Sequence, residues 1–219
     1  VARRGRNWDN WYPSWHAAIA AADACNASGQ NDAVACDDAY WNASGLRKDD
    51  LGYLSLDLPI GESVEWKTTG YLHQNEGQGL WGTPYAPTPG GAPISIRTTE
   101  YEIDRQGVLS ALTVTAGAHE INGGVWYETI EFNQARRFYG EPSSASPTRS
   151  FEDFQSNPFF TQWEYDFDTD TVVFHLQDTW SVTDQVRLNA GFRSVKSENE
   201  IRTVIAADPS PVQLPIRHA

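Results

Sequence analysis

Methionine is absent from all 219 residues, position 1 included, and cysteine occurs only twice. Basic residues are also few. Sixteen lysines and arginines face 29 acidic residues, and the net charge of −13 disfavours a protein that binds nucleic acid through a basic surface. The longest run of small apolar residues spans 17–22, far short of the roughly 20 residues of a membrane-spanning helix. No secretory signal is recognisable, so we expect a mature form or a fragment of a longer protein.

The two cysteines, Cys25 and Cys36, lie in a segment without a histidine cluster. A structural zinc site needs four ligands at close spacings, so the pair favours a disulfide in a loop, with two unpaired thiols as the alternative. A disulfide would indicate an oxidising compartment, such as the periplasm or the cell exterior.

Residues 1–50 are rich in Asn, Asp, Gly and Ser, and we interpret them as a structured loop insertion. Within them, residues 12–24 have Pro13 near their start and an alanine-rich interior, which predicts a short helix.

From residue 51 onward, apolar and polar side chains alternate with the period of a β-strand. Residues 51–219 therefore predict an all-β segment of about six long strands, arranged as hairpins at about 51–76, 98–133 and 162–202. The turns within these hairpins are short, whereas the stretches between them are long. The glycine and proline content of residues 75–95 argues against a regular element there, and 134–160 reads as another long loop.

Short turns at one end and long loops at the other are typical of an outer-membrane β-barrel. The expected strands, of up to about 15 to 19 residues, exceed the roughly 9 to 11 residues that cross a bilayer, so they would project beyond the membrane. We therefore interpret the segment as part of a transmembrane antiparallel β-barrel.

The third hairpin gives the clearest indication that one face of a strand meets water along part of its length and hydrocarbon along the rest. Its even positions are acidic from Glu164 to Asp170 and then apolar from Val172 to Leu176, followed by Asp178 and Trp180. A barrel strand meets water above the bilayer and hydrocarbon within it, so one face can change character in this way. The alternative is a β-bulge near 168–170 that exchanges the faces of a soluble strand. The returning arm puts Leu188, Ala190 and Phe192 on the side expected to face lipid.

The same hairpin, residues 174–195, resembles the strand, turn and strand signature of TonB-dependent outer-membrane transporters. That signature runs as an aromatic, then Gln-Asp, Trp, a turn with Thr and Asp, and then Leu, Gly and Arg. Ser194 and Val195 depart from it, because an aromatic and an acid commonly follow the Arg. The matching residues are Phe174, Gln177, Asp178, Trp180, Thr183, Asp184, Leu188, Gly191 and Arg193.

The resemblance implies a bacterial outer-membrane receptor of about 22 strands with an N-terminal plug, of which this chain would be an internal piece. It further implies binding of a scarce solute such as a siderophore, cobalamin or an oligosaccharide at the loops. Import would be energised through TonB by way of the missing plug, and lipid and lipopolysaccharide would surround the barrel. Two alternatives stay open: a secreted β-rich carbohydrate-binding module, and a passive porin.

Motifs that would indicate other chemistry are weak. Gly77, Gly79 and Gly82 spell G-x-G-x-x-G, but no helix follows to hold a pyrophosphate. The aspartates at 166, 168 and 170 have calcium-loop spacing without the loop's glycine or its final glutamate, which favours an exposed acidic strand, with weak cation binding as the alternative. The histidines are scattered, so we expect no catalytic residues, no metal site, no cofactor and no enzyme.

Aromatic residues are abundant, with nine each of Trp, Tyr and Phe. Aromatic rings bind planar ligands and sugars, and arginines bind anionic groups. Packing within loops or membrane girdles is the alternative role for each aromatic residue. The candidate ligand-binding residues are Trp81, Tyr85, Arg136, Arg137, Trp163, Tyr165 and Phe167.

Overall fold

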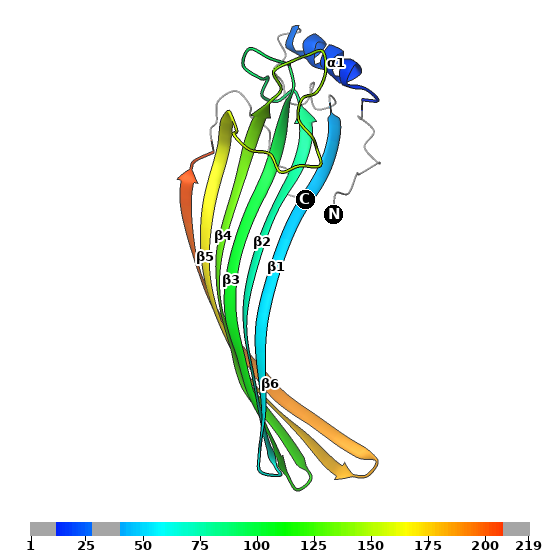
Figure 1. The fold of residues 1–219 in the computed structure, drawn as a ribbon. Helices are drawn as coiled ribbons and strands as arrows, with labels where there is room; N and C mark the ends of the chain where they lie inside the picture. Colours follow the sequence, from blue (N-terminus) through cyan, green and yellow to red (C-terminus); the bar gives the residue numbers. More distant parts are fainter. Residues whose placement is uncertain (1–11, 28–39, 208–219) are drawn as a thin grey trace.

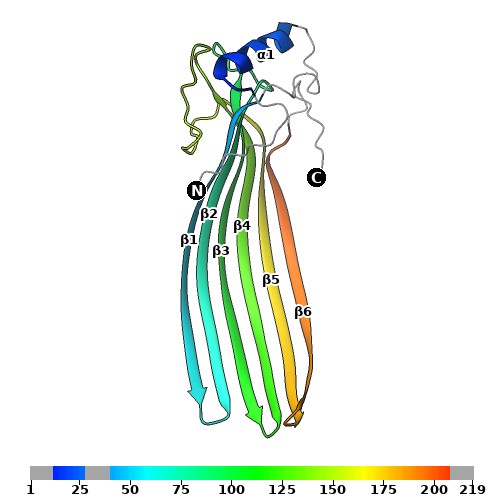
Figure 2. The ribbon, with the colours of Figure 1, turned by 90° about the vertical axis from the view of Figure 1, so that its right-hand side faces the viewer.

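A computed structural model describes residues 12–27 and 40–207 of the chain. Six antiparallel strands form one sheet in sequence order, with β1 and β6 as its two edges, and one short helix lies at the end with the long loops (Figure 1; Figure 2). This architecture confirms the all-β prediction. Among the described residues, no helix is long and apolar enough to cross a membrane. The elements are α1 (Trp15–Ala27), β1 (Trp41–Ile60), β2 (Val64–Thr83), β3 (Ser95–Ala116), β4 (His119–Gly140), β5 (Phe160–Thr183) and β6 (Val186–Ile205).

The three hairpins close through short turns at one end of the sheet, which we call the turn end. Gly61 and Gly117 occupy the first two turns with φ of 66° and 61°, a left-handed conformation that costs glycine little. In the third turn the hydroxyl of Thr183 accepts hydrogen bonds from the backbone N–H groups of Gln185 and Val186, at 3.2 and 3.1 Å. The opposite end, with the long loops and α1, is the loop end (Figure 1).

The strands are longer than expected from the sequence, because β2 continues through its glycines to Thr83 and β4 continues to Gly140. The glycines leave room for aromatic rings. A Cβ on Gly77 would lie 2.4 Å from the ring of Tyr101, and one on Gly79 would lie 2.9 Å from the ring of Trp81. The rings cover the glycine backbone of the strand, which offsets the low strand propensity of these glycines.

Because β2 is extended, its partner β1 is extended as well. Residues 43–50 pair with 74–81, so β1 begins at Trp41, and the expected boundary between residues 50 and 51 falls inside a strand. A register irregularity between Trp41 and Ala43 accompanies the positive φ of 48° at Asn42.

The two faces of the sheet are defined by the strand register. We call outer the face that carries the even-numbered residues of β1, β2, β3, β5 and β6 and the odd-numbered residues of β4, and inner the opposite face. Pairing along β5 is continuous from Tyr165 to Ser181. The alternative of a face-exchanging bulge at 168–170 is therefore wrong, and the acidic and apolar residues of β5 do share one face.

The outer face of the turn-end half is an apolar band across all six strands, with Asp178 of β5, 2.8 Å from His119 of β4, as a charged position within it. Its side chains are largely exposed, for example Leu54 at 81% and Phe192 at 63%. Successive rows of one face are about 6.8 Å apart along a strand, so five rows cover about 27 Å before tilt, close to the roughly 25 Å apolar band of membrane barrels. The band includes Leu54, Leu56, Leu58, Trp66, Val108, Leu112, Val125, Phe174, Leu176, Trp180, Leu188 and Phe192.

The inner face behind this band is mostly polar, with Leu109, Ala111, Trp126 and Val173 among the apolar exceptions. It carries hydroxyl, amide, histidine and charged side chains at the positions that alternate with the apolar ones. Glycines Gly124 and Gly191 add no apolar surface. The polar residues include Ser55, Asp57, Lys67, Thr69, Asn122, His175, Gln177, Arg187, Asn189 and Arg193.

The compact core lies at the loop end rather than between two sheets. Helix α1 begins after Ser14, whose hydroxyl accepts a hydrogen bond from the N–H of Ala17 at 3.2 Å, as an N-cap does. Its buried side chains are three or four residues apart, which places them on one face of the helix. They pack against the loop before β3 in a cluster of Trp15, Ala18, Ile19, Ala22, Ala92 and Ile94.

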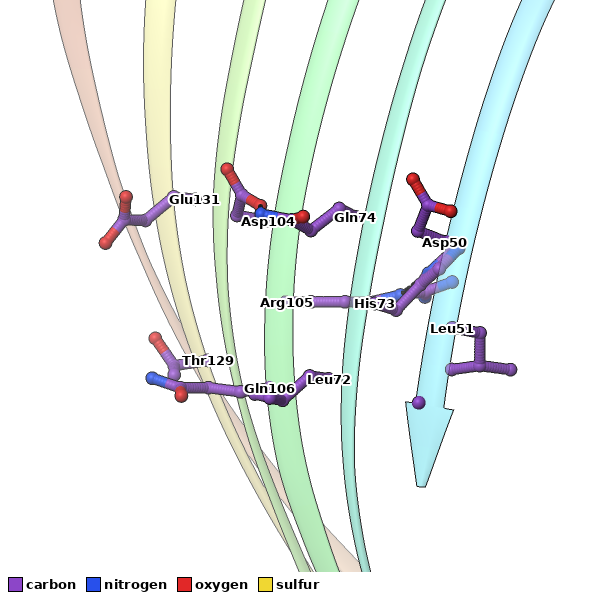
Figure 3. A pocket seen from close by; sticks show the side chains of 11 residues that line it. Asp50, Leu51, Leu72, His73, Gln74, Asp104, Arg105, Gln106, Thr129 and Glu131 are labelled. Carbon is purple, nitrogen blue, oxygen red and sulfur yellow. Dashed lines mark hydrogen bonds between the residues drawn. The ribbon is translucent and has the colours of Figure 1, made fainter.

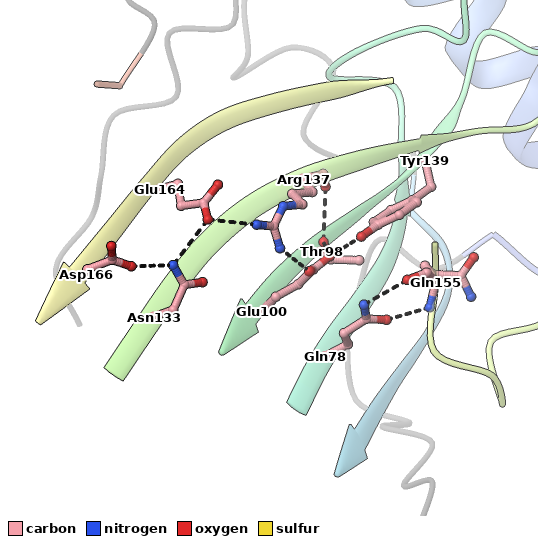
Figure 4. Close-up of polar contacts among 9 residues, drawn as sticks. All are labelled: Gln78, Thr98, Glu100, Asn133, Arg137, Tyr139, Gln155, Glu164 and Asp166. Atoms are coloured by element: carbon pink, nitrogen blue, oxygen red, sulfur yellow. Dashed lines mark hydrogen bonds and ion pairs between the residues drawn. The ribbon is translucent and has the colours of Figure 1, made fainter. Parts of the chain in front are cut away.

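Residues 141–159, which we call the covering loop, fold over the outer face at the loop end. Phe151 of this loop packs on Leu46, Leu80, Ile96 and Tyr139. Its polar contacts are equally specific, because Gln78 donates to the carbonyl of Gln155 at 3.1 Å and accepts from its N–H at 2.6 Å (Figure 4). The loop end therefore has a covered outer face, unlike the turn end.

Candidate functional site

Two arginines and three aromatic rings gather on the inner face at the loop end. Trp81 of β2 pairs with Arg97 of β3, and Arg136 of β4 pairs with Trp163 of β5. Tyr85 follows β2 and reaches the same place. The strand register thus collects side chains that are distant in the sequence, and we call these five residues the arginine–aromatic cluster.

Each guanidinium group of the cluster lies near an aromatic ring. The Cζ of Arg97 is 4.9 Å from the ring centre of Tyr85 and 5.4 Å from that of Trp81, and the Cζ of Arg136 is 5.3 Å from the ring centre of Trp163. At these distances the negative face of a ring attracts the cation. The rings hold the arginines without neutralising them.

The positive charge of the cluster is incompletely compensated. The Nε atoms of Arg97 and Arg136 are buried and make no hydrogen bond within the described part of the chain. Burial, followed by the charge of Arg97, lowers the pKa of Arg136 to about 10. Arg136 still carries its proton at neutral pH, so two like charges share a partly desolvated site. An anionic group placed between them would gain charge-assisted hydrogen bonds.

Tyr85 is fixed by its own contacts. Its hydroxyl lies 2.5 Å from the hydroxyl of Tyr40, and its ring packs with Ala86 and Phe138. Phe160 stacks on Phe138 with ring centres 5.6 Å apart. These contacts give the cluster a rigid side toward the loops.

An aromatic row continues from the cluster toward the middle of the sheet. Trp163, Tyr165 and Phe167 alternate along the inner face of β5, with successive ring centres 5.7 and 6.5 Å apart. Phe132 of β4 stacks on Phe167 at 5.2 Å. The predicted residues of β5 therefore do share one face with Arg136, in a row that leads away from the loops. Whether they bind a ligand stays a prediction.

Arg137, which the sequence groups with Arg136, lies on the opposite face. Its guanidinium contacts the carboxylate of Glu100 at 2.7 Å and that of Glu164 at 3.0 Å (Figure 4). Neighbouring carboxylates outweigh burial and raise the pKa of Arg137. Glu100 also accepts hydrogen bonds from Thr98 and Tyr139, both at 2.5 Å. Arg137 is thus a satisfied structural residue and is not brought together with the cluster.

The other predicted features fall elsewhere. Cys25, in α1, is disulfide-bonded, whereas Cys36 lies outside the described residues. The glycines of the G-x-G-x-x-G pattern lie within β2, so that pattern makes no phosphate loop. The three aspartates of β5 line up along the outer face, and Asp166 pairs with Arg202 at 2.5 Å. Among the described residues, no group of three or more His, Cys, Asp or Glu side chains is arranged to hold a metal ion.

Sequence reasoning missed Arg97. The signal in the sequence was the strand alternation. If β2 continues past its glycines in register with β3, Trp81 and Arg97 are cross-strand partners on the same face. Treating residues 75–95 as a loop removed that register and hid the second arginine.

Comparison with known proteins gives a distant similarity in fold. No family model matches the chain, and no curated protein matches its sequence. The crystal structure of BauA, the ferric preacinetobactin receptor from Acinetobacter baumannii, is similar in fold with a TM-score of 0.49 and 13% sequence identity. The similarity covers 73% of this chain, and this chain spans only 26% of that receptor.

Proposed function

We propose that this chain is part of a TonB-dependent outer-membrane transporter, one that binds a scarce solute at its loop end and imports it with energy from the inner membrane. The solute classes we propose are a siderophore, cobalamin or an oligosaccharide. The lower, turn-end half of the sheet crosses the bilayer in this proposal, and the loop end projects outside. Backbone groups at a sheet edge are not left unpaired in hydrocarbon, so further strands would pair with β1 and β6.

The observation that carries the proposal is the exposed apolar band on a single sheet. Leu188 and Phe192 are 53% and 63% exposed, and no second sheet covers them among the described residues. Soluble monomers rarely expose a contiguous apolar surface of this extent. A bilayer on the outer side and water on the inner side account for both faces of the same strands.

The arginine–aromatic cluster supports a binding role on the inner face. Its two incompletely compensated cations suit an anionic solute, and its rings suit a planar or sugar-like one. A carbohydrate-binding module would present Trp rings to solvent, whereas here the Trp81 and Trp163 rings each lie against an arginine.

Fractionation and uptake by cells that express the intact protein test the proposal. We expect the protein in the outer-membrane fraction, with migration in gels that shifts on boiling, as folded barrels show. Cells should accumulate one labelled solute from a panel of ferric siderophores, cobalamin and oligosaccharides, and a protonophore should abolish the accumulation.

The alternatives give different results in the same assay. A monomer that is soluble in plain buffer would favour the secreted module. Uptake that persists after the protonophore would favour a passive porin. Arg136→Gln should weaken solute binding, with Arg187→Gln, an inner-face arginine at the turn end, as the matched control.

A further inference from the structure

The outer face has a hollow where the apolar band meets the acidic half of the sheet. One part, of about 660 Å³, is lined by the apolar side chains of Leu54, Leu72, Val108 and Tyr127. A second part of about 680 Å³ continues toward the loop end and shares Leu72 with the first. The two parts form one groove that runs from apolar to polar surroundings.

Two glycines make the floor of this groove. Gly52 of β1 and Gly70 of β2 are both on the outer face, and a Cβ built on either would meet nothing within 4 Å. The groove is therefore open because side chains are missing, not because neighbours have moved apart. Larger side chains fit at both positions without strain.

The polar end of the groove is acidic across the whole sheet. Figure 3 shows Asp50, Gln74, Asp104 and Glu131 at one level, on four successive strands. Gln74 donates a hydrogen bond to Asp104 at 2.8 Å. The register adds no Lys or Arg to this row or to the next row toward the turn end; the remaining members of the two rows are Asp168, Glu200, Gly52, Leu72, Gln106, Thr129, Asp170 and Glu198.

We propose that the groove binds one membrane lipid whose polar group carries a primary ammonium. An acyl chain would lie along Leu54, Leu72 and Val108, beside the glycine floor. The ammonium would lie beside the carboxylates of Asp104 and Glu131, which are paired across β3 and β4, with Asp50 adding negative charge two strands away. This inference rests on the proposed function, because only a membrane-inserted outer face meets lipid.

Donors for the lipid phosphate lie between these two zones. Gln106 and Thr129 line both parts of the groove, one level below the carboxylates (Figure 3). An amide N–H and a hydroxyl can each donate to a phosphate oxygen. The order along the groove, apolar wall, neutral donors and then carboxylates, matches the order chain, phosphate and ammonium in such a lipid.

Charge and geometry favour an ammonium over other head groups. An anionic head group would meet like charges, because neither row carries a base; Arg105, which also lines the hollow, has its side chain on the inner face and donates to His73 at 2.7 Å. A metal ion that bridges a lipid phosphate to one or two carboxylates is the competing occupant, and the chelator experiment below distinguishes it from the ammonium. A primary ammonium has three N–H donors, which can reach the paired carboxylates of Asp104 and Glu131 and a water molecule.

Lipid enrichment around the intact protein tests the inference. The protein is reconstituted into nanodiscs of equal parts phosphatidylethanolamine and phosphatidylglycerol, and the lipids that remain bound are counted by native mass spectrometry. We expect phosphatidylethanolamine to be enriched about fivefold. Replacing it with phosphatidylcholine, whose trimethylated ammonium donates no hydrogen bond, should lower the enrichment.

Two variants and a control separate the groove from the rest of the surface. Gly70→Leu fills the groove and keeps the face apolar, so the enrichment should be lost. Asp104→Asn with Glu131→Gln should lose it as well. Gly45→Leu, at a position in β1 that is equally open but on the inner face, should leave the enrichment unchanged.

Other outcomes overturn the inference. Bound lipids at the bulk ratio would remove the site. If phosphatidylglycerol is enriched instead, and this enrichment requires Mg²⁺ and disappears with a chelator, the groove binds a lipid phosphate through a bridging metal ion and not an ammonium. Protein that fails to insert into nanodiscs at all would contradict the proposed function, which gel migration before and after boiling detects separately.

Discussion

The outer and inner faces of this sheet have opposite characters at its two ends. At the turn end the outer face is apolar and exposed, and the inner face is polar. At the loop end the outer face carries charged side chains in ion pairs and lies partly under the covering loop, whereas the inner face holds the arginine–aromatic cluster. Adjacent residues of one strand therefore experience different surroundings, and each comparison below sets an inward-facing residue against an outward-facing one.

The largest difference should appear in the apolar band. Leu176 points outward and Gln177 inward on β5. Leu176→Arg should destabilise the membrane-inserted protein by about 2 to 4 kcal/mol, because the charge would lie in hydrocarbon. Gln177→Arg should cost less than about 1 kcal/mol, because the inner side is wet. Urea titration of the intact protein in vesicles, followed by tryptophan fluorescence, measures both.

Equal costs for the two variants would contradict the assignment of the faces. The pair is matched, because both changes introduce an arginine into neighbouring positions of one strand.

The adjacent arginines give the next comparison. Arg137→Gln should destabilise the protein by about 2 kcal/mol, less than the roughly 3 to 5 kcal/mol of a fully buried pair, because it leaves Glu100 and Glu164 without their cation. Arg136→Gln should cost little stability, because it removes a like charge beside Arg97, but it should weaken binding of an anionic solute about tenfold.

Chemical denaturation and a binding titration read these two effects separately. An Arg136→Gln variant that loses stability and keeps its affinity would show that Arg136 has a structural role only.

An inward-facing glycine of β2, Gly77, should tolerate substitution by alanine less well than an outward-facing glycine of β1, Gly52. Gly77→Ala places a Cβ against the Tyr101 ring and should cost about 1 kcal/mol, because the ring must move. Gly52→Ala meets nothing and should be neutral or slightly stabilising. Thermal unfolding of both variants in one detergent decides between them, and a Gly77→Ala protein as stable as Gly52→Ala would show that the ring does not lie across the strand.

Much of this fold was predictable because each strand of the turn-end half carries its own pattern. Residues 51–58 and 186–193 alternate strictly, so their strands and faces follow from the sequence alone. The acidic residues of β5 were also assigned to the correct face. Local alternation suffices wherever each face meets a single solvent.

The loop end was less predictable because cross-strand contacts decide it. The glycines of β2 read as a break until Tyr101 and Trp81 cover them, and both rings take their places from pairing with distant residues. The pairing of Arg97 with Trp81 and the separation of Arg137 from Arg136 follow from the same register. A wrong end point for one strand therefore hides half of the candidate site.

The smallest effect concerns Asp49 and Asp50, inner and outer neighbours on β1 above the apolar band. Arg47, with contributions from His73 and Asn75, lowers the pKa of Asp49 to about 2. A carboxylate with a lowered folded-state pKa adds stability above its usual pKa and loses it as pH falls toward the folded value. Asp49→Asn should thus lower the urea midpoint of unfolding at pH 7. The difference in urea midpoint between the variant and the wild type should become smaller between pH 4 and 2. Asp50→Asn is the control, because it removes an equal charge outside this network; a gap for Asp49→Asn that stays constant on acidification would mean that these contacts do not stabilise the ionised form.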